Sequence, residues 1–417
     1  MEDRGIGARP FVLLLLAWAV FRGAELAIFG AGFGYDPNLY LSYARSWGAG
    51  AAPYAAFHPE YPPGALLLFI APFLVGGVAY STPFQVEMAI FDAATLAVVF
   101  AFARRLWPGN TARHILVAAG YLIATAALHP VLYWRYDLAP AALTVVAFYL
   151  ATTGRESFGA IVLGIAGAVK LWPLAVAPFW IGAAERRKGW RGALRDAGWI
   201  SGGAALLALP FLQRAGLGVL GFLRYQSERT LQVESVGANL ALLLDAAGVS
   251  STRVTYDHGA FNVHGGSATA LLAASRIVVL VLTLAPQAIA LRRRPDTAMS
   301  MRTWVDVATA TVLGLLLGAS VFSPQFMLWI VPLLVLAGNG GVALAVVAAA
   351  LTTALYPSLY DPLVLRQPPG YAIALTCLSL RNLLLAAAYV AIVRRLIRDA
   401  SRSAAPGGKP DIAGAAT

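Results

Sequence analysis

Runs of apolar residues, many of them close to twenty residues long, recur along nearly the whole chain between short polar segments. A helix needs roughly 20 residues to cross a hydrocarbon core about 30 Å thick. The pattern therefore predicts an all-α fold, a polytopic bundle of transmembrane helices. Apolar runs and helix breakers predict about twelve spans, at 11–30, 63–79, 84–103, 114–130, 138–153, 158–181, 198–212, 268–291, 303–320, 325–338, 341–356 and 372–396.

The first of these runs also resembles the apolar core of a signal peptide. We interpret it as an uncleaved helix, because it is too long, lacks a small-residue cleavage site and leads into further spans.

Composition supports the membrane class and excludes others. Hydrophobic residues make up 59% of the chain, charged residues 12%, and the mean hydropathy is +0.70. The single cysteine, Cys377, excludes a disulfide framework and a cysteine metal site. The net charge of +11 does not indicate a nucleic-acid partner, because basic residues at span ends follow from orientation rules and anionic lipid.

Four basic clusters fix the expected orientation. They are Arg4 and Arg9; Arg186, Arg187, Lys188, Arg191 and Arg195; Arg292, Arg293, Arg294 and Arg302; and Arg394, Arg395, Arg398 and Arg402. In the twelve-span scheme all four lie on one side, which the positive-inside rule makes cytoplasmic. Arg104, Arg105 and Arg113 would lie outside, which indicates a miscounted or half-depth helix in the first half, with 161–180 the first place to look.

The spans form one predicted domain over residues 1–400, with two long outward loops at about 32–62 and 213–267. Loops of this length in a tight bundle suggest function, and the plain alternative is that they only link spans. Residues 401–417 turn to Ser, Ala, Gly and Pro without an apolar face, which predicts a disordered cytoplasmic tail.

The first loop opens with Gly34-Tyr35-Asp36-Pro37-Asn38-Leu39-Tyr40. A carboxylate just outside a membrane span is a candidate base, since limited hydration at the membrane surface raises its basicity. The structural alternative is that Asp36 caps a short helix that begins near Pro37. Both roles can hold at once.

Several segments of the chain together resemble one family. They are Asp36 with Tyr40, Gly50 to Tyr54, Glu60-Tyr61-Pro62-Pro63, Gly164 to Lys170 with Trp172-Pro173, Arg229 to Ser235, and Phe322 to Phe326 with Trp329 and Pro332. Their order and spacing look like the GT-C glycosyltransferases, and within them glycosyltransferase family 87, the polyprenyl-phosphate-mannose-dependent α-1,2-mannosyltransferases. The resemblance implies a GT-C-type bundle and a lipid-linked sugar donor.

The chemistry of such a transfer assigns roles to particular residues. A transfer with inversion needs a base that takes the proton of the acceptor hydroxyl, for which Asp36 is the candidate. A polyprenyl-phosphate donor leaves as a phosphate monoester, so a cation should face it, and the planar guanidinium of Arg229 is our first choice. Arg224, Arg253 and Arg366 are alternatives, and each can instead be an interfacial arginine.

Further polar and aromatic residues in the outward segments are weaker candidates for substrate binding. They are Tyr40, Tyr54, His58, Glu60, Tyr61, Gln232, Glu234, His258, His264, Ser323 and Gln325. The aromatic members can stack on sugar faces, and the histidines can bind sugar, assist proton transfer or hold a divalent cation with Asp36 and Glu60. Their spacing matches no ligand motif, so we assign no metal site and leave a divalent cation as an open alternative.

Five further ionisable groups in apolar runs are functional candidates because burial in hydrocarbon is costly. They are Glu25, Glu87, Asp92, Asp137 and Lys170. Asp92 and Glu87 alternatively lie near the cytoplasmic surface, and Asp137 alternatively pairs with Arg135.

The sequence thus predicts a multi-pass glycosyltransferase of the plasma membrane with its active site facing outside. It would move a sugar, mannose in the first instance, with inversion from a polyprenyl phosphate to a hydroxyl of a cell-envelope glycolipid or polysaccharide. Its expected partners are this donor, the acceptor and membrane lipids, with no nucleic acid. The alternative is a transporter or flippase of lipid-linked sugars, which often carries internal repeats that the two halves here do not show.

Overall fold

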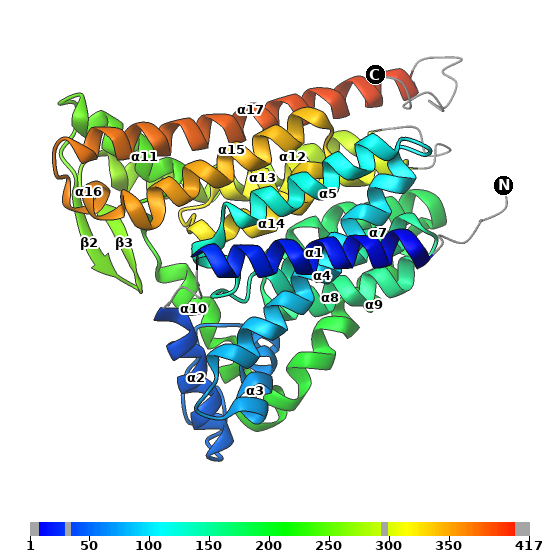
Figure 1. Cartoon of the computed structure of the whole chain (residues 1–417), viewed down its shortest axis with the longest axis horizontal. Coiled ribbons are helices and arrows are strands. Elements are labelled where there is room, and N and C mark those ends of the chain that lie inside the picture. The colour runs from blue at the N-terminus through cyan, green and yellow to red at the C-terminus, as the bar shows by residue number, and fades with distance from the viewer. Residues whose placement is uncertain (1–7, 30–34, 293–298, 405–417) are drawn as a thin grey trace.

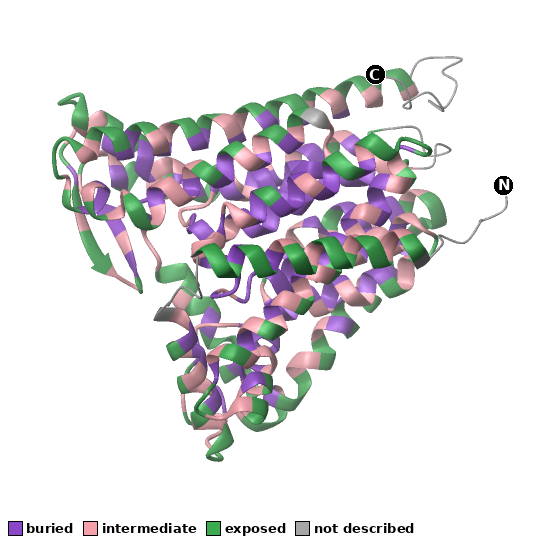
Figure 2. Cartoon of the chain, viewed as in Figure 1, coloured by how far each residue is buried: buried purple, intermediate pink, exposed green. Residues whose placement is uncertain are grey.

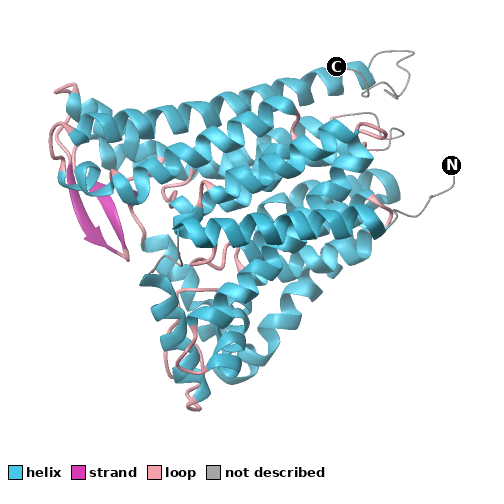
Figure 3. Ribbon diagram, in the orientation of Figure 1, coloured by secondary structure: helices cyan, strands magenta, loops and turns pink. Residues whose placement is uncertain are grey.

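Helices that run between two opposite ends of the molecule make up most of the structure (Figures 1 and 3). The computed structural model describes residues 8–29, 35–292 and 299–404. Within that part, six helices are long and apolar enough to cross a membrane: Arg9–Ile28, Ser81–Leu106, Trp172–Glu228, Ser267–Ala290, Gly340–Ser358 and Gly370–Ser403. Shorter apolar helices pack among them, so the chain is a mostly helical, polytopic membrane protein, as predicted.

The elements follow one another along the chain with short connections. The first half supplies α1 (Ala8–Phe29), α2 (Tyr35–Gly48), α3 (Pro63–Gly76), α4 (Ser81–Leu106), α5 (Thr111–Ala126), α6 (His129–Leu132), α7 (Leu138–Thr152), α8 (Glu156–Val169), η1 (Trp172–Val176) and α9 (Ala177–Ala215). The second half supplies η2 (Gly216–Leu220), α10 (Gly221–Glu228), β1 (Leu231–Gln232), α11 (Val236–Ala246), β2 (Arg253–Asp257), β3 (Ala260–His264), α12 (Ser267–Ala290), α13 (Met301–Gly318), η3 (Pro324–Phe326), α14 (Met327–Leu336), α15 (Asn339–Thr353), η4 (Ala354–Ser358), α16 (Tyr360–Leu365) and α17 (Gly370–Ala404).

Buried residues concentrate at the centre of the bundle, and exposed apolar residues lie on its outer helices (Figure 2). All ten residues of α14 are buried. On α1, by contrast, Val20 and Ile28 are 75% and 73% exposed. Exposed aliphatic side chains along a helix of spanning length indicate a lipid-facing surface, because a water-facing helix would carry polar residues there.

Two of the predicted spans have different boundaries in the structure. The span predicted at 63–79 corresponds to α3, which begins at Pro63 and ends at Gly76. The span predicted at 158–181 is broken, since α8 ends at Val169 and a new helical segment begins at Trp172. The chain breaks again inside α9 at Gly189, whose φ of +66° favours glycine.

The backbones of α8 and α9 lie in close contact. A Cβ atom at Gly164 of α8 would lie 2.0 Å from the carbonyl oxygen of Ile200 of α9. A Cβ atom at Gly203 of α9 would lie 2.1 Å from the carbonyl oxygen of Ile161. Small residues at such positions let membrane helices approach closely, and a larger side chain would separate α8 from α9.

The basic clusters gather at one end of the bundle, which we call the basic end. The guanidinium carbons of Arg113 and Arg302 lie 4.4 and 5.5 Å from the ring centre of Trp107, and Arg105 Nε donates to the Tyr149 hydroxyl at 3.2 Å. The start of α1 and the end of α17 lie at this end as well (Figure 1). Counting α3 as a full span is what had placed Arg104, Arg105 and Arg113 on the opposite side.

The second long loop contains a small β-sheet that the helical pattern did not predict. Strands β2 and β3 form an antiparallel hairpin, and β1 pairs with β3 to give the order β1-β3-β2. His258 and Gly259 connect the hairpin with φ angles of +47° and +71°, as a two-residue turn of the mirror-image type requires. The sequence signal that could have predicted this hairpin is the Asp-His-Gly-Ala turn, which stands between runs that contain Val254, Tyr256 and Val263.

The first residues of the predicted C-terminal tail are helical. Residues 401–404 continue α17 as helix. The rest of the predicted tail, and Arg4, Arg293 and Arg294 of the basic clusters, lie outside the described residues.

Asp92 is the centre of a buried polar network between α1, α4 and α5. Its carboxylate accepts hydrogen bonds from Trp18 Nε1 at 2.6 Å, Arg22 Nε at 2.8 Å and the Tyr121 hydroxyl at 2.7 Å. Arg22 also donates from Nη1 to Glu25 Oε2 at 2.6 Å. Asp92 is fully buried, so it does not lie at a cytoplasmic surface, and its network joins α1 to the rest of the bundle.

Candidate functional site

Asp36 lies in the first turn of α2, away from the basic end (Figure 1). Its carboxylate forms an ion pair with the guanidinium of Arg135, which stands in the turn between α6 and α7. The Tyr40 hydroxyl, one helical turn further on, donates to Asp36 Oδ2 at 3.4 Å. The side chains of Asp36 and Arg135 are 20% and 12% exposed, so the pair is reachable but largely enclosed.

Asp137 is paired with a different cation from the one expected. Lys170 Nζ lies 2.5 Å from Asp137 Oδ1, and Trp329 Nε1 donates to the same oxygen at 2.6 Å. The expected pair of Arg135 with Asp137 is therefore not the one that forms, because Arg135 turns to Asp36. Three segments far apart in the sequence meet at the Asp137 carboxylate.

Aromatic rings surround the Lys170 ammonium group. Its nitrogen lies 4.6 Å from the ring centre of Tyr136, 5.1 Å from Phe326 and 5.2 Å from Trp329. An ammonium group over aromatic faces gains cation–π attraction, more so where water is excluded. The break between α8 and η1 is what brings this lysine to the site, since Lys170 stands at the end of α8 in extended conformation.

Arg229 follows the last turn of α10 and is partly exposed. Its charge and that of Arg135 both act on Lys170, so the three cations share one region. Arg135 and Lys170 each have a carboxylate partner. Arg229 makes no side-chain hydrogen bond or ion pair with any residue that the structure describes, which leaves its guanidinium free for an anion.

Aromatic residues of the first loop form a wall beside Asp36. Tyr40 is stacked on Phe69 with ring centres 4.1 Å apart, and Tyr61 meets Tyr136 edge to face at 5.4 Å. The Tyr54 hydroxyl donates to the carbonyl oxygen of Tyr61 at 2.6 Å. Tyr40 and Tyr54 are 1% and 3% exposed, so their faces pack against protein, whereas Tyr61 is half-buried.

Glu60 and His58 stand at the entrance to α3 with different surroundings. Glu60 is half-buried, and its charge acts on the Tyr61 and Tyr225 phenols. Arg229 acts on the same Tyr225 in the opposite direction, so Glu60 borders the cation region. His58 is exposed and makes no side-chain contact with Asp36 among the described residues.

Gln232 and Ser323 bind one another instead of facing an open space. Gln232 Nε2 donates to Ser323 Oγ at 2.9 Å, and Ser323 Oγ lies 3.0 Å from Gln232 Oε1. Both residues are buried. They join β1 to the segment before α14, while Gln325, two residues on, is half-buried.

Glu234 is fully buried against Arg381 of α17. Arg381 Nη1 lies 3.5 Å from Glu234 Oε1, and Arg381 Nη2 donates to the Glu234 carbonyl oxygen at 2.6 Å. Both side chains are 0% exposed, so Glu234 holds the outward segment onto α17 and has no open route to a sugar hydroxyl in this arrangement. Arg381 lies within an apolar run, where sequence analysis did not select it.

The Glu234 carboxyl group should make the stability of the protein depend on pH. Burial raises the pKa of Glu234 from 4.5 to about 7, against the opposing effect of Arg381. Because the folded chain binds this proton more tightly, the free energy of unfolding should fall as pH rises from about 4.5 to 7 and then level off. We expect Glu234→Gln to remove this pH dependence. The total change in the free energy of unfolding that it removes is at most about 3 kcal/mol.

Thermal unfolding in detergent at pH 5, 6, 7 and 8 measures the slope. The exposed Glu228→Gln variant is the matched control and should follow the wild type. Parallel curves for the wild type and Glu234→Gln would contradict the prediction.

His258 and His264 flank a single carboxylate on the β2–β3 hairpin. His258 Nδ1 lies 3.0 Å from Asp257 Oδ1, and His264 Nε2 lies 2.9 Å from Asp257 Oδ2. Partial burial acts to raise the pKa of Asp257, but these hydrogen bonds outweigh it and hold that pKa below its usual range. The Tyr225 hydroxyl donates to the His258 carbonyl oxygen at 2.9 Å, so the hairpin touches the helix that carries Arg229.

The alternative arginines have partners or face solvent. Arg224 pairs with Glu228 at 2.8 Å on an exposed surface, Arg366 pairs with Asp245 at 2.6 Å, and Arg253 is exposed. In residues 8–29, 35–292 and 299–404, no group of three or more His, Cys, Asp or Glu side chains is placed to hold a metal ion.

The structure thus brings Asp36, Glu60, Tyr61 and Arg229 of the predicted set to one region and adds Arg135, Asp137, Lys170 and Trp329 to it. It sets Gln232, Glu234 and Ser323 in buried packing contacts.

Comparison with known proteins gives one family. The model of glycosyltransferase family 87 matches residues 57–309, which is more than half of the chain. No curated protein matches the chain in a sequence search.

Two solved structures are similar in shape to the chain at low sequence identity. The first is the apo structure of ArnT from Cupriavidus metallidurans, with a TM-score of 0.46 and 14% identity over 92% of this chain and 77% of that one. The second is the arabinosyltransferase EmbB from Mycobacterium smegmatis, with a TM-score of 0.41 and 13% identity over 95% of this chain and 42% of that one.

Proposed function

Because this chain belongs to glycosyltransferase family 87, we propose that it transfers a sugar from a polyprenyl phosphate to a hydroxyl group of a cell-envelope glycolipid or polysaccharide, with inversion at the sugar carbon. Mannose is the sugar we propose first. The observation that carries the proposal is the ion pair of one partly enclosed carboxylate, Asp36, with Arg135, whose charge acts on Lys170 together with that of Arg229.

Asp36 is the proposed base. As the acceptor oxygen attacks the sugar carbon, its proton passes to the Asp36 carboxylate, and the bond from sugar to phosphate breaks with the electron pair left on the phosphate oxygen. A carboxylate held by a guanidinium is a weaker base than a free one. Arg135 therefore has to leave Asp36 before reaction, and the donor phosphate is the anion that would draw it away.

The leaving phosphate gains charge as the bond to the sugar breaks, so fixed cations around it lower the barrier. Arg135 and Arg229 offer planar donors that match phosphate oxygens, while Lys170 supplies a charge held between Asp137 and three aromatic rings. Arg229 is the member of this group with a free guanidinium and is the proposed first contact for the donor.

We expect Arg229→Gln to weaken donor binding about 10- to 100-fold, since a hydrogen bond to a charged group contributes about 1.5–3 kcal/mol. Arg229→Lys should lose less, because it keeps the charge and loses only the planar fork. The KM for the polyprenyl-phosphate donor at saturating acceptor measures the effect. Arg191→Gln, an exposed arginine of the basic end, is the control, and a KM in Arg229→Gln equal to that of the control would contradict the assignment.

We also propose the placement in the membrane. With α3 outside, the membrane is crossed by α1, α4, α5, α7, α8, the two parts of α9 on either side of Gly189, α12, α13, α14, α15 and α17. This scheme keeps the predicted twelve crossings and places every basic cluster, Arg104, Arg105 and Arg113 included, on the cytoplasmic side. Asp36 then faces outside, residues 1–400 act as one transferase domain, and the plasma membrane is the proposed location.

The test is transfer by the purified protein in lipid nanodiscs with polyprenyl-phosphate mannose and a panel of envelope glycolipids. Sugar transfer with inverted configuration at the new bond supports the proposal. Movement of the lipid-linked sugar between leaflets of proteoliposomes, without any transfer, would instead support the transporter alternative. A second donor sugar that is used better than mannose would correct the sugar and keep the transferase.

A further inference from the structure

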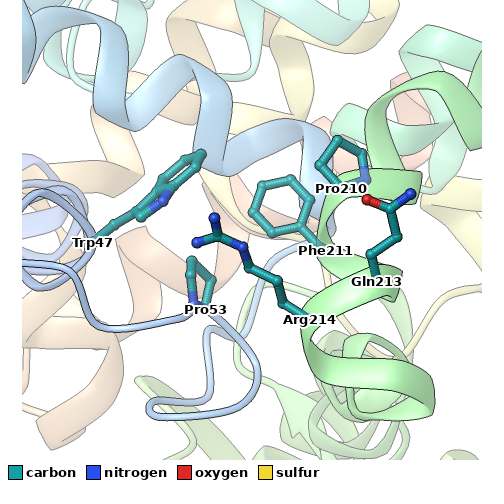
Figure 4. A pocket seen from close by; sticks show the side chains of 6 residues that line it. All are labelled: Trp47, Pro53, Pro210, Phe211, Gln213 and Arg214. Atoms are coloured by element: carbon teal, nitrogen blue, oxygen red, sulfur yellow. The ribbon is translucent and has the colours of Figure 1, made fainter.

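A pocket lies at the other end of α2 from Asp36, where α2 meets the end of α9 (Figure 4). Its volume is about 260 Å³. It is lined by Trp47, Pro53, Pro210, Phe211, Gln213 and Arg214. Asp36 and Trp47 are eleven residues apart on one helix, which corresponds to about 16 Å.

The lining combines an aromatic surface with a cation. The rings of Trp47 and Phe211 are 5.3 Å apart, and Figure 4 shows the Arg214 guanidinium extended toward Trp47 and Pro53. Arg214 is exposed and makes no side-chain hydrogen bond or ion pair with any residue in the described ranges. An unpaired guanidinium beside an indole ring suits a phosphate or carboxylate that is joined to a group with an apolar face.

Exposed leucines of α9 and η2 stand close in the sequence to the lining residues 210–214. Leu206, Leu209 and Leu217 are 63%, 52% and 79% exposed. All three lie within the apolar segment Trp172–Glu228. An arginine and a tryptophan at the end of such a segment are typical of the membrane interface. A ligand that holds its anionic group at Arg214 can therefore keep an acyl chain in the adjacent bilayer.

The pocket is linked to the candidate site through aromatic packing. Phe211 meets Tyr54 edge to face with ring centres 5.8 Å apart. The Tyr54 hydroxyl in turn donates a hydrogen bond to the Tyr61 carbonyl oxygen. The proposed donor has one bridging phosphate, and Arg135, Lys170 and Arg229 already form a place for it. A second anion site about 16 Å away along α2 thus calls for a second substrate.

We propose that this pocket binds the anionic head of the lipid-anchored acceptor, at a part of that molecule remote from the reacting hydroxyl. The acceptor's phosphate would contact Arg214 and Gln213, an adjoining part of its head that does not react would lie against Trp47 and Phe211, and its chains would lie beside Leu206 and Leu209. The inference rests on the proposed transferase function. Binding energy from such a remote part holds the reacting hydroxyl near Asp36.

The first experiment measures binding and does not depend on transfer. The wild-type protein, Arg214→Gln and Trp47→Ala are compared by native mass spectrometry for retention of phosphatidylglycerol, with phosphatidylcholine as the neutral-headgroup comparison and inorganic phosphate as competitor. We expect about tenfold weaker retention of phosphatidylglycerol in both variants and unchanged retention in Arg155→Gln, an exposed arginine at the basic end. Arg214 is exposed, so its variant tests the pocket even if Trp47→Ala folds poorly.

Equal retention by the wild type and Arg214→Gln would overturn the proposal. Complete displacement of the lipid by inorganic phosphate at millimolar concentration, together with no effect of Trp47→Ala in a folded protein, would show a free-anion site and would overturn it too.

The second experiment uses the transfer assay. Arg214→Gln should raise the KM for the acceptor about tenfold while the KM for the donor stays as in the wild type. A rise confined to the donor KM would place Arg214 with the donor and overturn the acceptor assignment. If no variant or wild-type protein transfers sugar, the proposed function fails, and the lipid-binding result still decides whether the pocket binds an anionic lipid.

Discussion

Asp36→Asn should lower kcat for sugar transfer by about 10²- to 10⁴-fold, the usual contribution of a general base. Asparagine keeps the size of the side chain but cannot take up the acceptor proton. The same change frees Arg135 from its ion pair, so the guanidinium becomes fully available to the donor phosphate. Donor affinity should therefore be kept or improved while turnover is lost.

Single-turnover transfer and equilibrium binding of polyprenyl-phosphate mannose, measured on the same preparation, separate the two effects. Asp361→Asn makes the same chemical change at an exposed position and should behave as wild type. Asp36→Glu should recover part of the rate because it restores a carboxylate. A loss of donor affinity as large as the loss of rate would mean that Asp36 only holds Arg135 in place, and the base would have to be sought elsewhere.

Asp92→Ala should destabilise the folded protein by about 3–5 kcal/mol, the usual result of removing one partner from a buried ion pair. Arg22 would be left as a buried charge beside Glu25 alone, and the Trp18 indole and Tyr121 hydroxyl would lose their acceptor. Because α1 carries Trp18, Arg22 and Glu25, we expect this helix to separate first from α4 and α5.

The midpoint of thermal unfolding in a mild detergent measures the loss. Asp361→Ala, at an exposed position, should leave the midpoint unchanged. The triple variant Asp92→Leu, Arg22→Met and Glu25→Leu should recover much of the stability, since replacing a whole buried ion-pair group by apolar side chains is often close to neutral. If Asp92→Ala unfolds at the wild-type temperature, the network does not hold α1 in place.

These variants probe contacts between residues that are distant in sequence, and such contacts were the least predictable part of the site. Asp36 was selected from its own segment, by its polarity and its place beside a membrane span. For its partner Arg135 the expected alternative was a pair with the neighbouring Asp137, because a single sequence gives no reason to prefer a residue 99 positions away. Trp329 reaches Asp137 across 192 positions, and that contact comes only from packing.

The predicted sugar-binding residues illustrate a different limit. Gln232, Glu234 and Ser323 are polar residues in outward segments, and polarity alone suggested an open cavity. The structure buries all three, with Arg381 of α17 opposite Glu234, and it makes them connections between the outward segment and the bundle. A polar side chain in a loop is satisfied equally well by substrate or by another part of the protein, so the sequence could not decide between them.

What the sequence determined by itself is the class of protein and the family, since long apolar runs have to enter a membrane and local motifs are read without knowing their neighbours. It also selected the short segments that we propose carry the chemistry. Only the tertiary structure decided that the described residues of the basic clusters share one end, and which cation stands beside which carboxylate. Those outcomes depend on where helices break and on which helix ends lie side by side. Ion pairs and hydrogen bonds form only between groups that the packing of the helices has brought together.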